Sequence, residues 1–178
     1  KVLTRVPLRL PEMSKGMLRR AQTISAKDAG FITSRMGIGP NDRILEAGIG
    51  SGGLSMYLAR ILGNSGIHVT VEPRSEHADV ALENMRRARE SWSEFPTHHH
   101  IEGAIEDVVE EIRVCSEEFD GIILDLPEHP SAIEAVSPLL SIGGRLVCYC
   151  PVTSQLEAAW IACEQAGLEI EWAGELIE

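Results

Sequence analysis

Residues 45–54 read Leu-Glu-Ala-Gly-Ile-Gly-Ser-Gly-Gly-Leu and stand between an apolar segment and a segment with helical periodicity. Residues 43–47 have the composition of a short buried strand, and residues 52–62 have a helical pattern that ends at Gly63. Because glycine lacks a Cβ atom, the backbone between them can turn tightly and approach a ligand closely. The first amides of the following helix are free to bind that ligand. The stretch predicts a strand–turn–helix unit with a binding site at the turn.

The order of the acid and the glycines distinguishes two ligand classes. Dinucleotide sites use G-x-G-x-x-G and hold a pyrophosphate at the helix N-terminus. S-adenosylmethionine has no phosphate and is held by loops of the form E/D-x-G-x-G-x-G. Here Glu46 comes first and the glycines follow at Gly48, Gly50 and Gly52. This spacing favours S-adenosylmethionine over NAD, while a purely structural tight turn stays open as the alternative.

The alternation of strands and helices continues through the chain. We expect strands at 43–47, 67–71, 99–101, 119–125, 145–149 and 168–172, and helices at 26–36, 52–62, 76–89, 105–112, 131–140 and 154–166. This pattern predicts an α/β fold, a parallel sheet with helices on both faces in a three-layer αβα sandwich. Residues 1–24 contain two prolines and little periodicity, so we expect an arm or linker made of loop or a short strand.

Two acidic residues follow predicted strands, at the edge of a parallel sheet where ligands bind. Glu72 ends the second strand, where a carboxylate can accept both ribose hydroxyls of an adenosine. Asp125 follows the fourth strand in Asp-Leu-Pro, where its carboxylate can accept a hydrogen bond from an exocyclic amine. The alternatives are that Glu72 simply begins a helix and that Asp125 caps one.

The charge of the chain is unevenly distributed. Its 16 Lys and Arg against 27 Asp and Glu give a net charge of −11, which argues against a basic coat for nucleic acid. Residues 1–43 nevertheless carry +6 and the remainder carries −17. A basic segment on an acidic body can meet a polyanion, or it can be a solvated tail.

Composition indicates a cytoplasmic protein with no metal site and no membrane segment. No apolar run reaches the ~18 residues that a membrane span needs, and no signal-peptide pattern opens the chain. The four cysteines have no metal-binding spacing, so we expect free thiols. His98, His99 and His100 are consecutive in an expected strand, so their side chains alternate between faces and cannot all reach one ion.

Further blocks of sequence carry a family resemblance over residues 17–178. The most selective block is Arg-Arg-Ala-Gln-Thr-Ile at 19–24, followed by Ala-Lys-Asp-Ala-Gly at 26–30. Together with the loop at 45–54 and the segments 119–127 and 150–155, it resembles the tRNA (adenine-58-N1)-methyltransferase family, class I S-adenosylmethionine-dependent enzymes with a Rossmann-like fold. The resemblance implies methyl transfer from S-adenosylmethionine to N1 of the T-loop adenine 58 of tRNA, and it leaves open whether the neighbouring adenine is modified. It also implies a homotetramer.

The resemblance implies a role for each residue of the site. Asp125 would be the catalytic carboxylate that orients the target adenine. Gln22 to Ile24 would cover the methionine end of the cofactor, Glu72 would hold the ribose, and Gly103 with Ala104 would border the adenine. The full cofactor-binding set would be Gln22, Thr23, Ile24, Glu46, Gly48, Gly50, Ser51, Gly52, Gly53, Leu54, Glu72, His77, Gly103, Ala104 and Asp125.

The chain departs from the family pattern in a few places. Many members carry an acid where this chain has Ala104, so adenine recognition would use backbone amides or another group. Many carry an aromatic residue where this chain has Pro130, so base stacking is not expected there. The family's small N-terminal β domain and final strand pair are not present in full. We therefore expect residues 1–24 to be an arm or linker remnant, and 25–178 to be a catalytic domain clipped at both ends.

Other functions remain as alternatives. A class I methyltransferase acting on a corrin precursor or on isoaspartyl protein would need the glycine-rich loop and Glu72, but neither the block around Gln22 nor Asp125-Leu-Pro. A non-catalytic tRNA-binding paralogue subunit would be expected to have a degraded loop and no acid at the end of the fourth strand.

Overall fold

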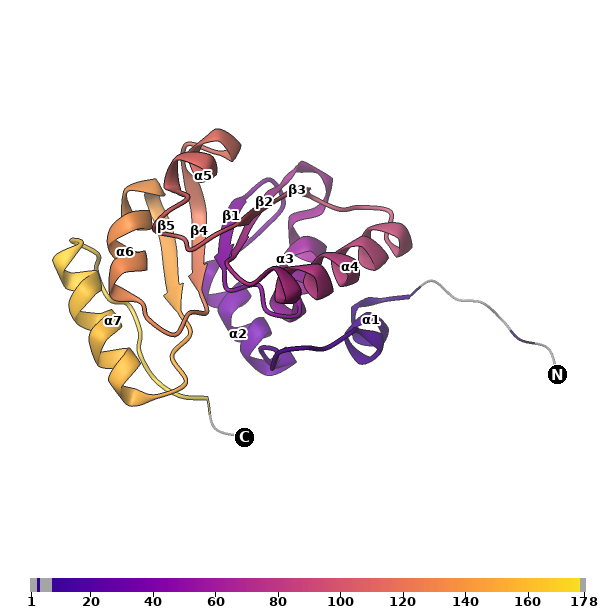
Figure 1. Cartoon of the computed structure of the whole chain (residues 1–178), viewed down its shortest axis with the longest axis horizontal. Helices are drawn as coiled ribbons and strands as arrows, with labels where there is room; N and C mark the ends of the chain where they lie inside the picture. The colour runs from indigo at the N-terminus through magenta and orange to yellow at the C-terminus, as the bar shows by residue number, and fades with distance from the viewer. Residues whose placement is uncertain (1–2, 4–7, 177–178) are drawn as a thin grey trace.

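The described residues form a parallel sheet covered by helices on both faces. The structure is a computed structural model and describes residue 3 and residues 8–176, so residues 1–2 and 4–7 of the expected arm lie outside it. The five strands are β1 Arg43–Ala47, β2 Ile67–Glu72, β3 Thr97–Glu102, β4 Phe119–Leu124 and β5 Leu140–Cys148. They lie in the order β3-β2-β1-β4-β5, and each neighbouring pair is parallel. β1 is therefore central, and the loop after it opens at the middle of one sheet edge (Figure 1).

Helices connect the strands. They are α1 Leu10–Gly16, α2 Ala26–Met36, α3 Gly53–Leu62, α4 Ser75–Ser91, α5 Val109–Cys115, α6 Pro130–Val136 and α7 Thr153–Gln165, with 3₁₀ helices at Gly63–Ser65 and Ser137–Leu139. The ends of α2 follow from its sequence, because the Ser25 Oγ accepts a hydrogen bond from the Asp28 amide at 3.1 Å. Gly37 ends the helix in the left-handed conformation, with φ 67°.

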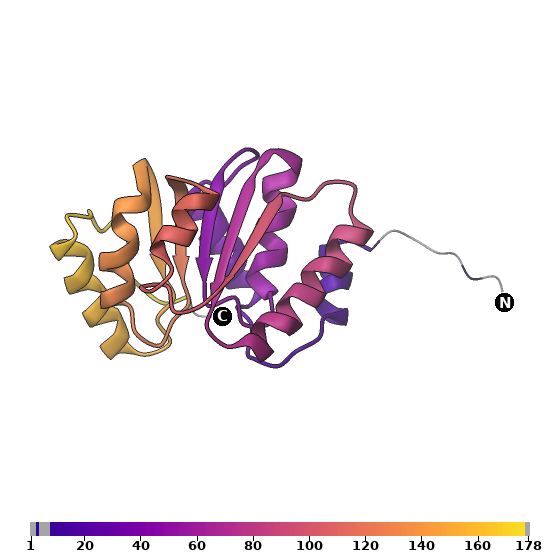
Figure 2. The same ribbon diagram turned by 45° about the horizontal axis from the view of Figure 1, so that its top comes forward.

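Alternate residues of the central strands point to opposite helical layers. Leu45 of β1 belongs to the buried cluster that includes side chains of α5, α6 and α7. Ile44 belongs to the cluster on the other side, with α2 and α3. A third cluster joins α1, α3 and α4 through Met13, Met56 and Met85. The three layers, which can be followed in Figures 1 and 2, confirm the predicted α/β sandwich.

Some predicted elements differ from the observed ones. α1 forms where loop or strand was expected, because Pro11 fits the first turn of a helix and Met13 packs against α3 and α4. The helix expected at 105–112 lies at Val109–Cys115 instead, although Ile105 and Val108 are buried as its apolar pattern required. The helix expected at 131–140 ends in the 3₁₀ turn that contains Pro138.

The sixth strand predicted at 168–172 was wrong, since the described residues there have no strand pairing. Tertiary side-chain contacts hold this segment instead. Trp172 packs edge-on against Phe31 of α2 with ring centroids 4.8 Å apart, and Glu171 pairs with Arg145 of β5 at 3.0 Å. The alternating pattern of the segment therefore reflects contacts with α2 and with the Arg145 side chain.

None of the helices in the described part of the chain has the length and apolarity required to cross a membrane. The four cysteines are free thiols, as their spacing predicted.

The packing of the core predicts that shortening a buried side chain of α3 lowers stability measurably. Leu58 is completely buried between α3 and the sheet, so Leu58→Ala should lower the free energy of unfolding by about 2–5 kcal/mol in urea denaturation. Glu157 of α7 is exposed, and Glu157→Ala should stay within about 0.5 kcal/mol of wild type. Equal losses for the two variants would contradict the assigned core.

Candidate active site

The glycine-rich loop leaves β1 between the ends of two neighbouring strands. The Gly48 amide donates to the carbonyl of Val71 at 2.9 Å, and the Asp125 amide donates to the carbonyl of Ala47 at 2.9 Å. Gly48 has φ 84°, and a Cβ atom there would overlap the backbone carbonyl of Asp125. Only glycine fits this position, both in conformation and in space. The close approach brings Asp125 to the loop.

The arm before α2 closes the other side of the loop. The backbone amides of Arg20 and Ala21 both donate to the Ser51 Oγ at 3.0 Å. A Cβ atom at Gly53 would lie 2.8 Å from the Cβ of Thr23, so the first turn of α3 packs directly against the arm. The arm is thereby held over the loop by two contacts, one with the Ser51 hydroxyl and one with Gly53 at the start of α3.

A small pocket lies where the arm, the loop and the end of β4 meet. Its lining is Gln22, Thr23, Ile24, Glu46, Gly48, Ile49, Gly50, Ser51, Gly53, Leu54 and Asp125. All of these except Ile49 were predicted as site residues from the sequence. The pocket therefore unites three segments that are far apart in the chain.

Five predicted residues lie outside this lining: Gly52, Glu72, His77, Gly103 and Ala104. Glu72 is nonetheless one hydrogen bond away, since its Oε2 accepts from the Gly50 amide at 3.3 Å. Gly52 packs against α4, where a Cβ atom would lie 3.3 Å from the Cα of Ala81.

Gly103 and Ala104 follow β3 in the turn next to β2. The Gly103 amide donates to the backbone carbonyl of Glu72 at 3.3 Å, so this turn adjoins the residue that ends β2. His77 lies in the first turn of α4, and its Nδ1 is buried without a hydrogen-bond partner in the structure. The sequence-predicted residues at 72, 77, 103 and 104 thus line the sheet edge beyond the pocket.

Arg74 dominates the electrostatics of Glu72. Its backbone amide and guanidinium donate to the fully buried carboxylate, with Nε to Oε1 at 2.7 Å and Nη2 to Oε2 at 3.1 Å. Burial alone would raise the pKa of Glu72, but the hydrogen bonds and charge of Arg74 outweigh it and the pKa is lowered. Glu72 is therefore ionised at neutral pH.

Asp125 has the opposite balance. Burial, together with the carboxylates of Glu46 and Glu72, raises its pKa to about 6 against the attraction of Arg74. A carboxyl group with a pKa near neutrality at the end of a strand can accept a hydrogen bond or a proton from a ligand amine.

Several supporting residues were not predicted from the sequence. The Glu46 carboxylate accepts from the Ser55 hydroxyl at 2.7 Å and meets the His68 Nε2 at 2.9 Å, so it is fixed beneath the loop. Gln155, at the start of α7, donates from Nε2 to the carbonyl of Pro127 at 2.8 Å and holds the turn after Asp125. Alternation of His68 with apolar residues in β2 was the available signal for the first contact.

The three consecutive histidines of β3 alternate in orientation as predicted. His98 and His100 both meet the Thr70 hydroxyl at 3.0 Å, while His99 is exposed. Among the described residues, no three or more His, Cys, Asp and Glu side chains are grouped so that they could hold a metal ion.

Comparison with known proteins then places the chain in a family. The family model described as "tRNA methyltransferase complex GCD14 subunit" matches residues 8–172. The chain belongs to this family. The family resemblance found in the sequence is confirmed, because curated relatives of the chain are named as tRNA (adenine-58-N1)-methyltransferases.

One relative is the "tRNA (adenine(57)-N(1)/adenine(58)-N(1))-methyltransferase TrmI" of Methanocaldococcus jannaschii, 32% identical, covering 94% of this chain and 65% of the relative. Another is the "tRNA (adenine(58)-N(1))-methyltransferase TrmI" of Thermus thermophilus, 33% identical, covering 83% and 54%. The chain thus spans between about half and two thirds of the length of these relatives.

The fold agrees with a solved structure as well. The tRNA (m1A58) methyltransferase TrmI of Aquifex aeolicus superposes with a TM-score of 0.73, at 22% identity, covering 89% of this chain and 60% of that chain. At this identity the likeness establishes the fold, and it confirms the predicted Rossmann-like methyltransferase architecture.

The close approach at Gly48 predicts that a substitution there lowers the free energy of unfolding more than one at another left-handed glycine. Gly37 has a similar left-handed conformation but open space around it, so Gly37→Ala should cost only the backbone strain, about 1–2 kcal/mol. Gly48→Ala adds a collision with the Asp125 carbonyl and should be clearly more destabilising in urea unfolding. Equal effects of the two substitutions would show that the contact at Gly48 is not as tight as described.

The raised pKa of Asp125 predicts a pH-dependent stability gain in Asp125→Asn. In the unfolded chain an aspartate titrates near pH ~3.9, whereas the folded pKa is about 6, so wild-type stability falls as pH rises through this window. Asparagine removes the cost of ionising a buried carboxyl group. The free energy of unfolding of the variant should therefore exceed that of wild type by about 2–3 kcal/mol at pH 7.5, and the two should be equal near pH 4. Thermal unfolding across this range measures it.

The matched control is Asp107→Asn, which makes the same substitution at an exposed position and should stay within about 0.5 kcal/mol of wild type. A pH-independent difference for Asp125→Asn would argue that burial does not perturb this carboxyl group.

Proposed function

We propose that the chain is an S-adenosylmethionine-dependent methyltransferase that modifies N1 of the T-loop adenine 58 in tRNA. The single observation that supports this most is the pocket where the arm residues 22–24, the glycine-rich loop and Asp125 meet. Family membership supports tRNA methylation, and the names of the relatives support the adenine. Whether the neighbouring adenine is also modified is a question for the same assay.

The residues at the turn fit S-adenosylmethionine. The buried carboxylate of Glu72 ends β2 beside the loop, where it can accept the two ribose hydroxyls. The Arg74 side chain that now bonds this carboxylate is more than half exposed, so it can leave without opening the core. A Cβ atom at Gly50 would lie 3.8 Å from the Cβ of Ala21, so the arm lies directly against the middle of the loop.

Each segment has a separate part in binding. Gln22 to Ile24 would cover the methionine end and exclude water, and the amides of Ser51 to Leu54 at the start of α3 would contact the cofactor. The turn at Gly103 and Ala104 would border the adenine moiety through its backbone amides, and His77 would contact the cofactor. When bound, the cofactor supplies a methyl group activated by its sulfonium.

Asp125 would orient the substrate. The N1 atom of adenine is already a lone-pair nucleophile, so the enzyme must mainly supply geometry and exclude water. The Asp125 carboxylate would accept a hydrogen bond from the exocyclic N6 amine and stabilise the positive charge on the methylated base. The proton that must later leave can pass to Asp125 or to water. Pro130 begins α6 at the position where the family resemblance implies an aromatic residue, so orientation would rest more heavily on Asp125.

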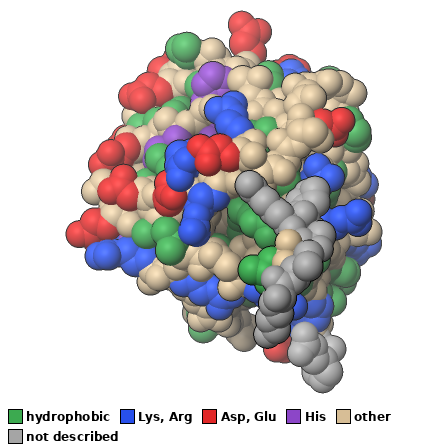
Figure 3. Space-filling view, turned by 90° about the vertical axis from the view of Figure 1, so that its right-hand side faces the viewer, with side chains coloured by type: hydrophobic (Ala, Val, Ile, Leu, Met, Phe, Trp, Pro, Cys, Tyr) green, Lys and Arg blue, Asp and Glu red, His purple; other side chains and the backbone are tan. Residues whose placement is uncertain are grey.

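The basic arm would contact the tRNA backbone. A T-loop adenine is stacked and must be flipped out, which costs a few kcal/mol. Phosphate contacts from Arg and Lys offset such a cost. The side of the molecule at the right of Figure 1, where α1 and α4 lie, has Lys and Arg side chains interspersed with acids (Figure 3). Arg19 and Arg20 are exposed and lie next to the pocket-lining residues 22–24.

The organisation of the protein is part of the same proposal. Residues 1–24 act as the arm, residues 25–178 form the catalytic domain, and the enzyme is a cytoplasmic homotetramer. Exposed apolar side chains support self-association: Val114, Ile142, Val152, Trp160, Ile161 and Trp172.

Methyl transfer tests this function directly. Purified protein, tritiated S-adenosylmethionine and unmodified tRNA transcript should yield label in 1-methyladenosine. Asp125→Ala should lower the rate by about 100-fold or more, because orientation of the adenine is lost. The control Glu164→Ala removes an exposed carboxylate of α7 and should retain the wild-type rate.

Label in another nucleoside, or in protein, would contradict the proposed substrate and favour another class I methyltransferase. Binding of S-adenosylhomocysteine is measured first by calorimetry, because the chain spans only part of its relatives. Absence of binding would contradict the proposed cofactor.

A further inference from the structure

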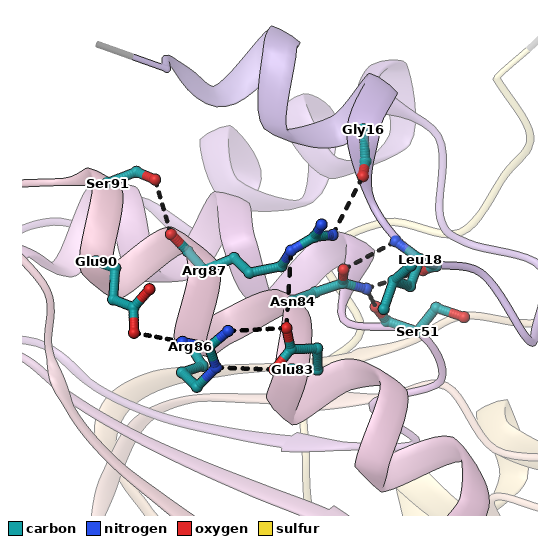
Figure 4. A network of polar contacts seen from close by, with 9 residues as sticks. All are labelled: Gly16, Leu18, Ser51, Glu83, Asn84, Arg86, Arg87, Glu90 and Ser91. Carbon is teal, nitrogen blue, oxygen red and sulfur yellow. Dashed lines mark hydrogen bonds and ion pairs between the residues drawn. The ribbon is translucent and has the colours of Figure 1, made fainter.

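Asn84 of α4 joins the arm to the glycine-rich loop. Its side chain is 1% exposed and makes three hydrogen bonds, all to backbone (Figure 4). Its Oδ1 accepts from the Leu18 amide at 2.9 Å, and its Nδ2 donates to the carbonyls of Leu18 at 2.8 Å and Ser51 at 2.9 Å. The Asn84 side-chain amide therefore bonds the N–H and carbonyl of one arm residue and a carbonyl of the loop.

The neighbouring turns of α4 make contacts on the same side. Ala81, one turn earlier, packs against Gly52, where a Cβ atom would lie 3.3 Å from the Ala81 Cα. Arg87, one turn later, donates from Nη1 to the carbonyl of Gly16 at 3.4 Å (Figure 4). Residues three apart share a helix face, so α4 presents one continuous face to the loop and the arm.

Ser51 completes the connection from the loop side. Its hydroxyl accepts from the amides of Arg20 and Ala21, and its carbonyl accepts from Asn84. Leu18, Arg20 and Ala21 are consequently fixed by two side chains, just before the residues at 22–24 that line the pocket. The position of those lining residues depends on how the preceding four residues are held.

Removing the Asn84 side chain would leave three backbone groups without their hydrogen-bond partner. The carbonyl of Ser51 would lose a buried bond, and the carbonyl and amide of Leu18 would lose partly buried bonds, which is costlier than losing fully exposed ones. The arm can escape that cost by moving into water, whereas the loop is held by β1, β2 and β4. The expected result of the loss is a displaced arm on an intact domain.

We propose that Asn84 is a positioning residue that fixes the arm and the glycine-rich loop in one geometry and thereby sets the affinity for S-adenosylmethionine. The inference rests on the proposed function of the pocket. It adds a residue that lies outside the pocket lining and contacts it through Ser51. Elsewhere on the same helix, Arg86 and Glu83 form a surface ion pair with each other.

Calorimetry with S-adenosylhomocysteine as the probe tests the proposal. Asn84→Ala should raise the dissociation constant about tenfold, because the arm must be ordered again on binding. Asp42→Ala is the control, since the Asp42 Oδ2 also accepts a backbone amide, from Gly39 at 2.7 Å, but just before β1, at the opposite end of this strand from the glycine-rich loop. It should bind like wild type. Unchanged affinity in Asn84→Ala would overturn the positioning role, whereas no binding by wild type would overturn the proposed function.

Coupling to Ser51 provides a readout that a merely structural role would not change. If Asn84 and Ser51 hold one arm geometry, the loss in affinity of Asn84→Ala with Ser51→Ala should be less than the sum of the single losses. Additive losses would contradict a shared geometry.

Amide hydrogen exchange of wild type tests the proposal without any substitution. Binding of S-adenosylhomocysteine should slow exchange at the amides of Leu18, Arg20 and Ala21 together with those of the loop. Slowed exchange in the loop alone would overturn the coupling between the two segments.

Discussion

The backbone contact between Gly48 and Asp125 is the constraint on which the site depends. The amide of Gly48 extends the pairing of β1 toward β2, and the amide of Asp125 extends the pairing of β4 toward β1. No side chain can stand between them at position 48. The ends of three strands are therefore held together, and Glu46, Glu72 and Asp125 are gathered at one edge. Burial, reinforced by the charges of Glu46 and Glu72, raises the pKa of Asp125 to about 6, while Arg74 keeps Glu72 ionised.

The arm completes the site at the carboxyl ends of these strands. The charge of the sequence alone did not distinguish this role from that of a solvated tail. A +6 segment on an acidic body was compatible with a solvated tail. The structure instead packs the described part of the arm along α3 and α4, with Met13 buried and the Trp92 Nε1 donating to the carbonyl of Leu8 at 3.1 Å. Its last residues line the pocket. The acidic net charge thus coexists with a basic border at the site.

The parallel sheet and most of the pocket could be predicted from the sequence, because strand-end positions in such a sheet converge wherever the chain places them. Asp125 and the loop glycines follow from this rule. Ser55, His68 and Asn84 did not, since each is a single polar residue in an element whose pattern says nothing about its distant partner. The segment at 168–172 was predicted as a strand from its alternation, yet Trp172 packs on Phe31 of α2 rather than extending the sheet. Local pattern cannot distinguish these outcomes.

A crystal structure of this chain with S-adenosylhomocysteine would show whether the pocket binds the cofactor beside Asp125. We predict the ligand between residues 22–24 and the loop at Gly48 to Gly53, with its ribose at Glu72 and its sulfur facing Asp125. A ligand bound elsewhere, or one at the loop with Asp125 turned away from the sulfur, would contradict it.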